Sequence, residues 1–271
     1  MTHTEDGSAA SASFDLTGRV VVVTGGGGGL GRAFCRAVAR HGAAVACVDR
    51  DLRGIEETLD VVAGYGGESL AVVADMTDSV QVDGSVEQVL AAFGRIDTLI
   101  ANAGITSDAV PLHETSPTDW EHMIRTNLTS QFLAMRAVLP TMMKQLSGTI
   151  INIASVGALG GNRIAPAAYG ASKAAVIALC KYAAVQYGAY GIRANCILPG
   201  IHITDFGMPE GESAKVERVT FLEEFAARSL PLGRVAYPHE LEGLVVLLAS
   251  DASSYITGAT FIQDGGGTAQ V

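Results

Sequence analysis

Short apolar runs alternate with longer amphipathic stretches along most of the chain. Arg19 to Thr24 is a continuous β-branched run, typical of a strand buried on both faces of a parallel sheet. A glycine-rich turn follows, and then Arg32 to Arg40 places its apolar residues on one helical face. Repeated alternation of this kind predicts right-handed crossovers and a parallel sheet with helices on both faces.

The same alternation continues toward the end of the chain. Further strands are expected at 44–48, 69–73, 98–101, 148–153, 193–198 and 260–263. Further helices are expected at 52–63, 80–93, 117–140, 169–187, 214–227 and 238–249. The fold class predicted is α/β, a single-domain Rossmann-type doubly wound fold.

No internal repeat or linker divides this pattern. Residues 1–13 are polar and lack the basic region and apolar core of a signal peptide, which predicts a disordered N-terminal tail before one domain over 14–271. Residues 201–229 form a longer, irregular connection at the carboxyl edge of the sheet. Such an excursion is typical of a lid or binding loop, so we predict a substrate lid here.

Composition narrows the class of protein. The chain is 48% hydrophobic and 17% charged, which is typical of a globular protein. A net charge of −10 argues against nucleic acid or an anionic membrane as partner, and no apolar run approaches the roughly 20 residues of a membrane span. The histidines are scattered, so no metal site is expected. Four isolated cysteines indicate small buried side chains and a cytoplasmic, reducing location.

The glycine turn is the first candidate for chemistry. Gly25 to Gly31 joins a strand to a helix, an arrangement in which backbone amides and the helix N-terminus can bind a pyrophosphate. A merely flexible loop is the alternative. Asp49 ends the second strand, where a carboxylate accepts hydrogen bonds from a ribose diol and repels a 2′-phosphate. NAD is therefore favoured over NADP, although the neighbouring Arg50 could accommodate the phosphate.

Other polar residues follow strands or interrupt helices. Asp75 lies just beyond a strand and could reach an adenine edge or form a turn. Asn102 to Gly104 ends another strand with small residues that permit close approach of a ligand. Asn127 within a helix is either an exposed amide or a buried group kept for a water relay. Ser155 directly follows the strand at 148–153, at the edge where ligands of such sheets bind.

Tyr169 and Lys173 lie four residues apart in a predicted helix. At that spacing both side chains lie on one helical face, so Lys173 can lie beside the Tyr169 hydroxyl. A neighbouring cation favours the phenolate, which makes Tyr169 a candidate proton donor and acceptor. The alternative is an ordinary solvated pair on a helix surface.

Together these motifs resemble the short-chain dehydrogenase/reductase family over Leu16 to about Thr268. The resemblance rests on TGxxxGxG from Thr24, NAG from Asn102, Asn127, Ser155 with the YxxxK pair, Pro199-Gly200 and the terminal DGG from Asp264. It implies a sheet of seven parallel strands, a dinucleotide cofactor, reversible oxidation of an alcohol, and a homotetramer.

The resemblance also implies residue roles. Tyr169 would be the acid/base, Lys173 would lower its pKa and bind the nicotinamide ribose, and Ser155 would hold the substrate oxygen. Asn127 would hold a water beside Lys173. The implied NAD contacts are Gly25, Gly28, Gly29, Leu30, Gly31, Asp49, Arg50, Asp75, Met76, Asn102, Ala103, Gly104, Tyr169, Lys173, Pro199, Gly200, His202 and Thr204.

Two features depart from the family pattern. Ser155 and Tyr169 are 169 − 155 = 14 residues apart, one more than usual, so the loop between them carries an extra residue. His202 occupies a position that is commonly isoleucine. We expect substrate contacts from Ser155, Gly157 and Tyr169, and from one or more of Asn162, Arg163 and Ile164 in the lengthened loop. Asn162 or Arg163 is expected to recognise a polar substrate group; simple surface exposure of these two is the alternative.

The function predicted is NAD-dependent interconversion of a secondary alcohol and its ketone, on a small or medium cyclic, aromatic or polyol substrate. One alternative is an NADPH-dependent 3-oxoacyl-thioester reductase, against which Asp49 argues. Another is a dinucleotide-sensing protein that has kept the fold and lost the chemistry.

Overall fold

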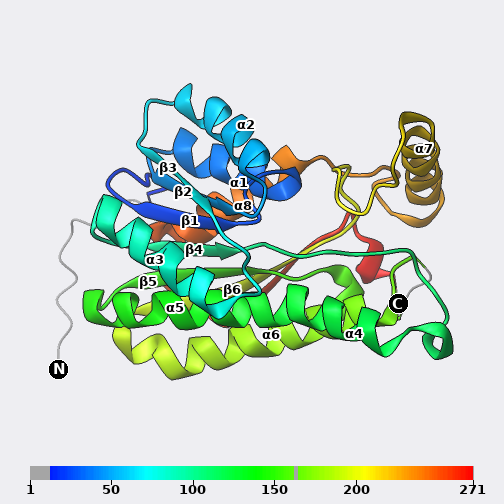
Figure 1. Ribbon diagram of the computed structural model, residues 1–271. Coiled ribbons are helices and arrows are strands. Elements are labelled where there is room, and N and C mark those ends of the chain that lie inside the picture. The colour runs from blue at the N-terminus through cyan, green and yellow to red at the C-terminus, as the bar shows by residue number, and fades with distance from the viewer. Residues whose placement is uncertain (1–12, 162–163, 271) are drawn as a thin grey trace, which may run out of the picture.

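The computed structural model describes residues 13–161 and 164–270. Within these ranges a seven-stranded sheet has the order β3-β2-β1-β4-β5-β6-β7, and every neighbouring pair is parallel (Figure 1). The strands are β1 Val20–Thr24, β2 Ala44–Asp49, β3 Ser69–Val73, β4 Thr98–Ala101, β5 Gly148–Ile153, β6 Ile192–Pro199 and β7 Thr260–Gln263. The predicted fold class and strand number are confirmed.

Helices cover both faces of the sheet. They are α1 Gly29–Arg40, α2 Leu52–Ala63, α3 Ser79–Phe93, α4 Pro117–Ile124, α5 Ser130–Gln145, α6 Ala167–Tyr187, α7 Glu212–Ser229 and α8 Glu242–Ala249. One hydrophobic core contains side chains of α1, α2 and α8, and a second contains side chains of α3, α5 and α6. Figure 1 shows these two helix layers on opposite sides of the sheet, with α7 standing apart from both.

The β1 strand explains why the sheet has two cores. Val20 and Val22 belong to the core with α3, α5 and α6, whereas Val21 and Val23 belong to the core with α1, α2 and α8. Successive strand residues point to opposite faces, so only a continuous apolar run can fill both. All four cysteines are likewise buried and unpaired, as their apolar surroundings predicted.

The expected single helix over 117–140 is wrong in two respects. A π-helical segment, Arg125–Thr129, separates α4 from α5, and α5 continues through Pro140 to Gln145. Proline removes one backbone donor from a helix. Pro140 lies on the exposed side of α5, where water can satisfy the freed carbonyl, while Leu139 and Met142 remain buried in the core.

The strand order creates a crevice at one edge of the sheet. The chain runs outward from β1 to β3 and then returns to place β4 on the other side of β1. Connections leaving β1 and β4 therefore diverge at their carboxyl ends, and ligands of open α/β sheets bind at such a point. Three expected site segments, at Gly25, Asn102 and Ser155, follow β1, β4 and β5 and so meet at this edge.

Candidate active site

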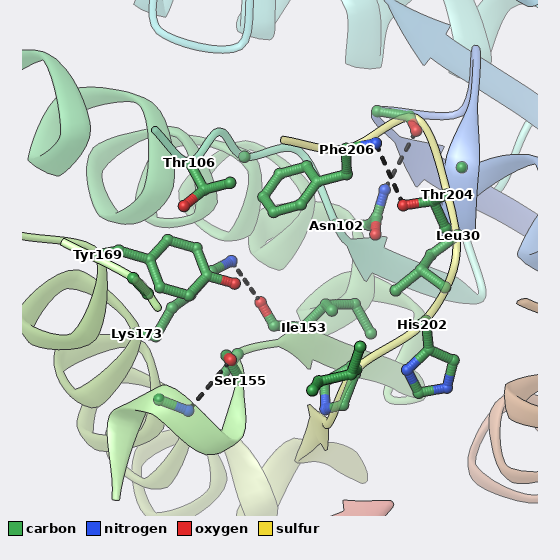
Figure 2. A pocket seen from close by; sticks show the side chains of 18 of the residues that line it. Leu30, Asn102, Thr106, Ile153, Ser155, Tyr169, Lys173, His202, Thr204 and Phe206 are labelled. Atoms are coloured by element: carbon green, nitrogen blue, oxygen red, sulfur yellow. Dashed lines mark hydrogen bonds between the residues drawn. The ribbon is translucent and has the colours of Figure 1, made fainter. Parts of the chain in front are cut away.

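A cavity of about 430 Å³ opens at the carboxyl edge of the sheet (Figure 2). Of the expected site residues, it is lined by Gly25, Gly28, Gly29, Leu30, Asp49, Asn102, Ala103, Gly104, Ser155, Gly157, Tyr169, Lys173, Pro199, Gly200, His202 and Thr204. An adjoining hollow of about 240 Å³ shares Gly25, Asp49, Ala103 and Gly104 and adds Arg50, Asp75 and Met76. Residues from seven widely separated segments thus meet in one continuous space.

The glycine turn forms one wall of the cavity. A Cβ atom on Gly31 would lie 1.9 Å from the Gly25 carbonyl oxygen, so only glycine fits where α1 packs against the turn. Gly25 has φ +65°, and its Cβ would lie 2.9 Å from the Ala103 Cα. Gly28, the N-cap of α1, has no side-chain cap and faces open space. The free amides of this helix start fit an anionic diphosphate.

Asp49 is held in a fixed orientation at the far end of the cavity. Its Oδ2 accepts a hydrogen bond from the Gly27 amide at 3.0 Å, and its Oδ1 accepts one from the Asp51 amide at 3.1 Å. Arg50 and Asp75 line the adjoining hollow. Asp75 accepts from the Thr77 amide and hydroxyl at 2.8 Å, and these bonds hold its pKa below the usual value. Asp75 therefore forms a turn, one of its two expected roles.

Thr24, which the sequence did not single out as a site residue, joins the glycine turn to β4. Its hydroxyl oxygen accepts from the amides of Asn102 at 3.0 Å and Ala103 at 3.2 Å. The Asn102 Nδ2 donates in return to the carbonyls of Thr24 and Gly25, each at 3.1 Å. The Asn102 side chain thus braces the turn.

Tyr169, in the first turn of α6, is half-buried over Ser155 at the end of β5. Burial raises the pKa of Tyr169 above its ordinary value, and a hydrogen bond with Ser155 opposes part of that rise. The Ser155 Oγ also accepts from the Gly157 amide at 3.1 Å, which fixes the hydroxyl at the mouth of the loop. Figure 2 shows both hydroxyl groups facing the same space.

Lys173 is buried one turn further along α6. Its Nζ donates to the Ile153 carbonyl at 2.9 Å and lies 5.8 Å from the centre of the Tyr169 ring. Burial lowers the pKa of Lys173 to about 8. The Lys173 ammonium donates to a backbone carbonyl of β5, and burial is the larger influence on the Tyr169 pKa here. That Lys173 lowers the pKa of Tyr169 stays a prediction.

Asn127 lies fully buried in the π-helical segment, so the exposed alternative is wrong. Its Oδ1 accepts from the Ile105 amide at 2.7 Å, and its Nδ2 donates to the Ile105 carbonyl at 2.9 Å and the Ser172 Oγ at 3.3 Å. Asn127 does not line the cavity. It ties the segment after β4 to the residue that precedes Lys173.

The segment that follows β6 lies against the glycine turn. A Cβ atom on Gly29 would lie 3.5 Å from the Thr204 Cβ. The His202 Nδ1 lies 3.2 Å from the Gly200 carbonyl, while its buried Nε2 has no hydrogen-bond partner among the described residues. Burial lowers the pKa of His202, which favours the neutral ring.

Other side chains line the cavity as well, among them Ile164, which the sequence singled out as a loop residue that could face the substrate. The ring of Phe206 lies 6.3 Å from that of Tyr169, tilted by 51°. Thr106, Val156 and Ile164 also line the cavity. For Phe206, the one signal in the sequence was an aromatic residue two positions after Thr204. Asn162 and Arg163, expected to recognise a polar group, lie outside the described residues.

Comparisons with known proteins agree with this geometry. A family model described as enoyl-(acyl carrier protein) reductase matches residues 25–268. The chain is 35% identical to D-threitol dehydrogenase of Mycolicibacterium smegmatis over 94% of this chain and 95% of that one. It is 36% identical to 3-oxoacyl-(acyl-carrier-protein) reductase of Thermotoga maritima over 93% of this chain and 98% of that one.

A solved structure of levodione reductase gives the same result. It superposes with a TM-score of 0.87 at 34% identity, covering 94% of this chain and all of the other (100%). Its likeness extends across the whole sheet and both helix layers. The chain belongs to the short-chain dehydrogenase/reductase family of oxidoreductases.

Proposed function

We propose that this chain interconverts a secondary alcohol and its ketone with NAD as the redox partner. The observation that carries the proposal is one continuous space with Tyr169, Ser155 and Lys173 at one end and the Asp49 carboxylate at the other. A bound nicotinamide dinucleotide supplies the hydride acceptor or donor. The capless start of α1 and the glycine turn fit its diphosphate, and Asp49 fits its ribose diol.

The protein's own groups handle the proton. Ser155 would hold the substrate oxygen, and Tyr169 would accept the hydroxyl proton during oxidation or donate it during reduction. The absence of a side chain on Gly104 leaves a space beside both Asn127 and Lys173. A Cβ atom on Gly104 would fill this space, 3.1 Å from the Asn127 Oδ1 and 3.4 Å from the Lys173 Nζ. This spacing supports the proposal that Asn127 holds a water beside Lys173.

The preference for NAD follows from how Asp49 is held. Two backbone amides orient its carboxylate, so a 2′-phosphate at the same place would meet a fixed negative charge. We expect kcat/KM with NADH to exceed that with NADPH by tenfold or more. In Asp49→Ser, with Arg50 left in place, the preference should shift toward NADPH. Equal use of both cofactors by the wild-type protein would overturn the proposal.

An NADPH-dependent 3-oxoacyl-thioester reductase is the second candidate. The reductase of Thermotoga maritima is a close relative, and Arg50 lines the hollow beside Asp49, where it could pair with a phosphate. Faster reduction of an acetoacetyl thioester than of any simple ketone, with NADPH preferred, would select this candidate. A dinucleotide-sensing protein would bind NADH but turn over no alcohol or ketone.

We also propose a homotetramer. Large apolar side chains are exposed on the outer faces of α5 and α6, among them Phe132, Tyr182 and Val185. Exposed apolar surface of this kind favours association between copies. Light scattering should give about 112 kDa, four times 28.0 kDa.

The segment 201–229 is proposed as a lid over the substrate. Leu222 and Ala226 of α7 form a small core with Val235, separate from the two main cores of the sheet. A segment with its own small core can move without disturbing the sheet, which supports this role.

A further inference from the structure

An apolar groove runs beside the cavity. It has a volume of about 720 Å³ and lies between the segments 109–112 and 157–161, with the first turns of α6 beneath. Every described residue lining it is alanine, glycine, valine, leucine or proline. No hydrogen-bonding side chain therefore faces a molecule in the groove from the part of the chain that the structure describes.

The groove adjoins the cavity. Gly157 and Ala165 line both spaces. Gly157 follows Ser155 by two residues, and its amide donates to the Ser155 hydroxyl. Gly157 and Ala165, which carry no side chain larger than a methyl group, therefore lie between the groove and a substrate oxygen held by Ser155 and Tyr169.

Charge is sparse at this end of the cavity. Phe206, Val156 and Ile164 provide apolar contacts near Tyr169. Asp205, the nearby carboxylate, is exposed and pairs with Lys215 at 3.4 Å. The buried Lys173 is the one lysine or arginine among the described cavity residues, and it bonds to the Ile153 carbonyl. Within residues 13–161 and 164–270, Lys173 is therefore the one cation that a charged substrate group would meet in the cavity.

The rim of the groove exposes large apolar side chains. Leu112 is 69% exposed, Leu159 50% and Val110 44%. Clustered exposed apolar side chains next to a cavity are typical of a binding surface. A small molecule that extends from the cavity would cover these side chains and gain from the apolar area removed from water.

We infer that the groove holds the apolar body of the substrate, so that the preferred substrate is an uncharged secondary alcohol or ketone on an alicyclic or alkyl framework. A polyol or a carboxylate-bearing alcohol would be disfavoured, because no described side chain in the groove can hydrogen-bond to it. This inference rests on the proposed function, since it assumes that Ser155 and Tyr169 hold the reacting oxygen.

The test measures kcat/KM with NAD for cyclohexanol, 4-ethylcyclohexanol and 4-butylcyclohexanol, with xylitol and 4-hydroxycyclohexanecarboxylate for comparison. The expected rise is up to about fourfold for each added methylene, the gain for burying one CH₂. Leu112→Arg should lower kcat/KM for the butyl compound tenfold or more and leave cyclohexanol within twofold. Leu146→Arg is the matched control, since Leu146 is 67% exposed at the end of α5, away from the groove.

The outcomes separate the inference from the proposed function. If no alcohol is oxidised and no ketone reduced, the proposed function fails. If cyclohexanol is oxidised but the alkyl series is flat, or Leu112→Arg affects all substrates alike, the inference alone is overturned. The inference would also be overturned if the protein preferred 4-hydroxycyclohexanecarboxylate and Arg163→Ala removed that preference. A further contrary result would be that Leu112→Arg changes the oligomeric state but not the kcat/KM values of the alkyl series. The groove would then be an interface between copies of the chain.

Discussion

Three polar side chains at or beside the cavity differ in how many hydrogen-bond partners the protein gives them. The Asn127 amide has hydrogen-bond partners at both its oxygen and its nitrogen. Lys173 has one carbonyl for an ammonium that can donate three hydrogen bonds. The His202 Nδ1 has the Gly200 carbonyl as a partner, whereas its buried Nε2 has no hydrogen-bond partner among the described residues. Burial of the Lys173 ammonium makes stability at this site depend on pH, and the unpartnered His202 Nε2 makes it depend on substitution.

Lys173 should give the protein a pH-dependent stability between pH 8 and 10.5. Its pKa is about 8 in the folded chain against 10.5 when unfolded, because burial disfavours the ammonium. In that window the unfolded chain binds a proton that the folded chain has released, so the stability of the wild type rises with pH. Relative to Lys173→Met, it should gain about 3 kcal/mol from pH 7 to pH 10.

Urea unfolding of both proteins across that pH range measures this difference. Using the difference between the two proteins cancels every other titrating group. A gap in the free energy of unfolding that stays constant with pH would contradict the assignment of a lowered pKa to Lys173.

His202→Ile should stabilise the protein by about 1 kcal/mol, because it removes a buried nitrogen that lacks a partner. His113→Ile is the control, since the His113 side chain is 81% exposed and its replacement should change little. Urea unfolding measures both. A destabilised His202→Ile with an unchanged control would mean that the imidazole contributes packing or bonding not evident from its contacts.

At the level of elements, the glycine turn combines a folding role and a binding role in different residues. Gly31 lets α1 pack against the turn, whereas Gly28 leaves the start of α1 open to the cavity. Gly28 and Gly31 are three positions apart. A side chain at Gly31 would meet backbone atoms, whereas a side chain at Gly28 would meet open space. Their replacement by alanine should therefore separate stability from affinity.

Gly31→Ala should lower the melting temperature by ten degrees or more or prevent folding, since a Cβ atom 1.9 Å from a carbonyl oxygen forces the helix to move. Gly28→Ala should leave the melting temperature nearly unchanged and weaken NADH binding several-fold. Thermal unfolding and titration of NADH fluorescence measure the two effects. Loss of stability in both variants alike would contradict this division.

The strands were predictable because each is a buried apolar run ended by glycine or a polar residue. The expected strands agree with the observed ones to within one residue at each end. The boundaries of the helix expected at 117–140 were not predictable. Neither the π-helical segment nor the position of Pro140 on the exposed side of α5 leaves a pattern in the neighbouring residues. Burial of Asn127 and the bond from Lys173 to Ile153 depend on contacts between distant segments, which residue spacing along one helix cannot reveal.

At the scale of the whole molecule, the sheet divides the proposed work between its two halves. Asp49 at the end of β2 and Arg50 beside it lie in the half that would hold the adenosine end of the cofactor. Ser155 after β5 and Tyr169 on α6 lie in the other half, next to the apolar groove. The order of strands thus places Asp49 and the reacting groups in different halves of the sheet, so binding of the adenosine end of the cofactor and choice of substrate should change independently.

Tyr169→Phe tests the central claim most directly, because it removes one hydroxyl from the cavity and leaves the ring in place. The measurement is the rate of NADH formation from cyclohexanol, followed by absorbance and paired with the Kd for NADH. We expect kcat to fall by about 10² to 10⁴-fold, the usual contribution of a general acid or base, with the Kd within about twofold of the wild type. Turnover that survives the substitution, with NADH still bound, would contradict the assignment of Tyr169 as the proton-transferring group.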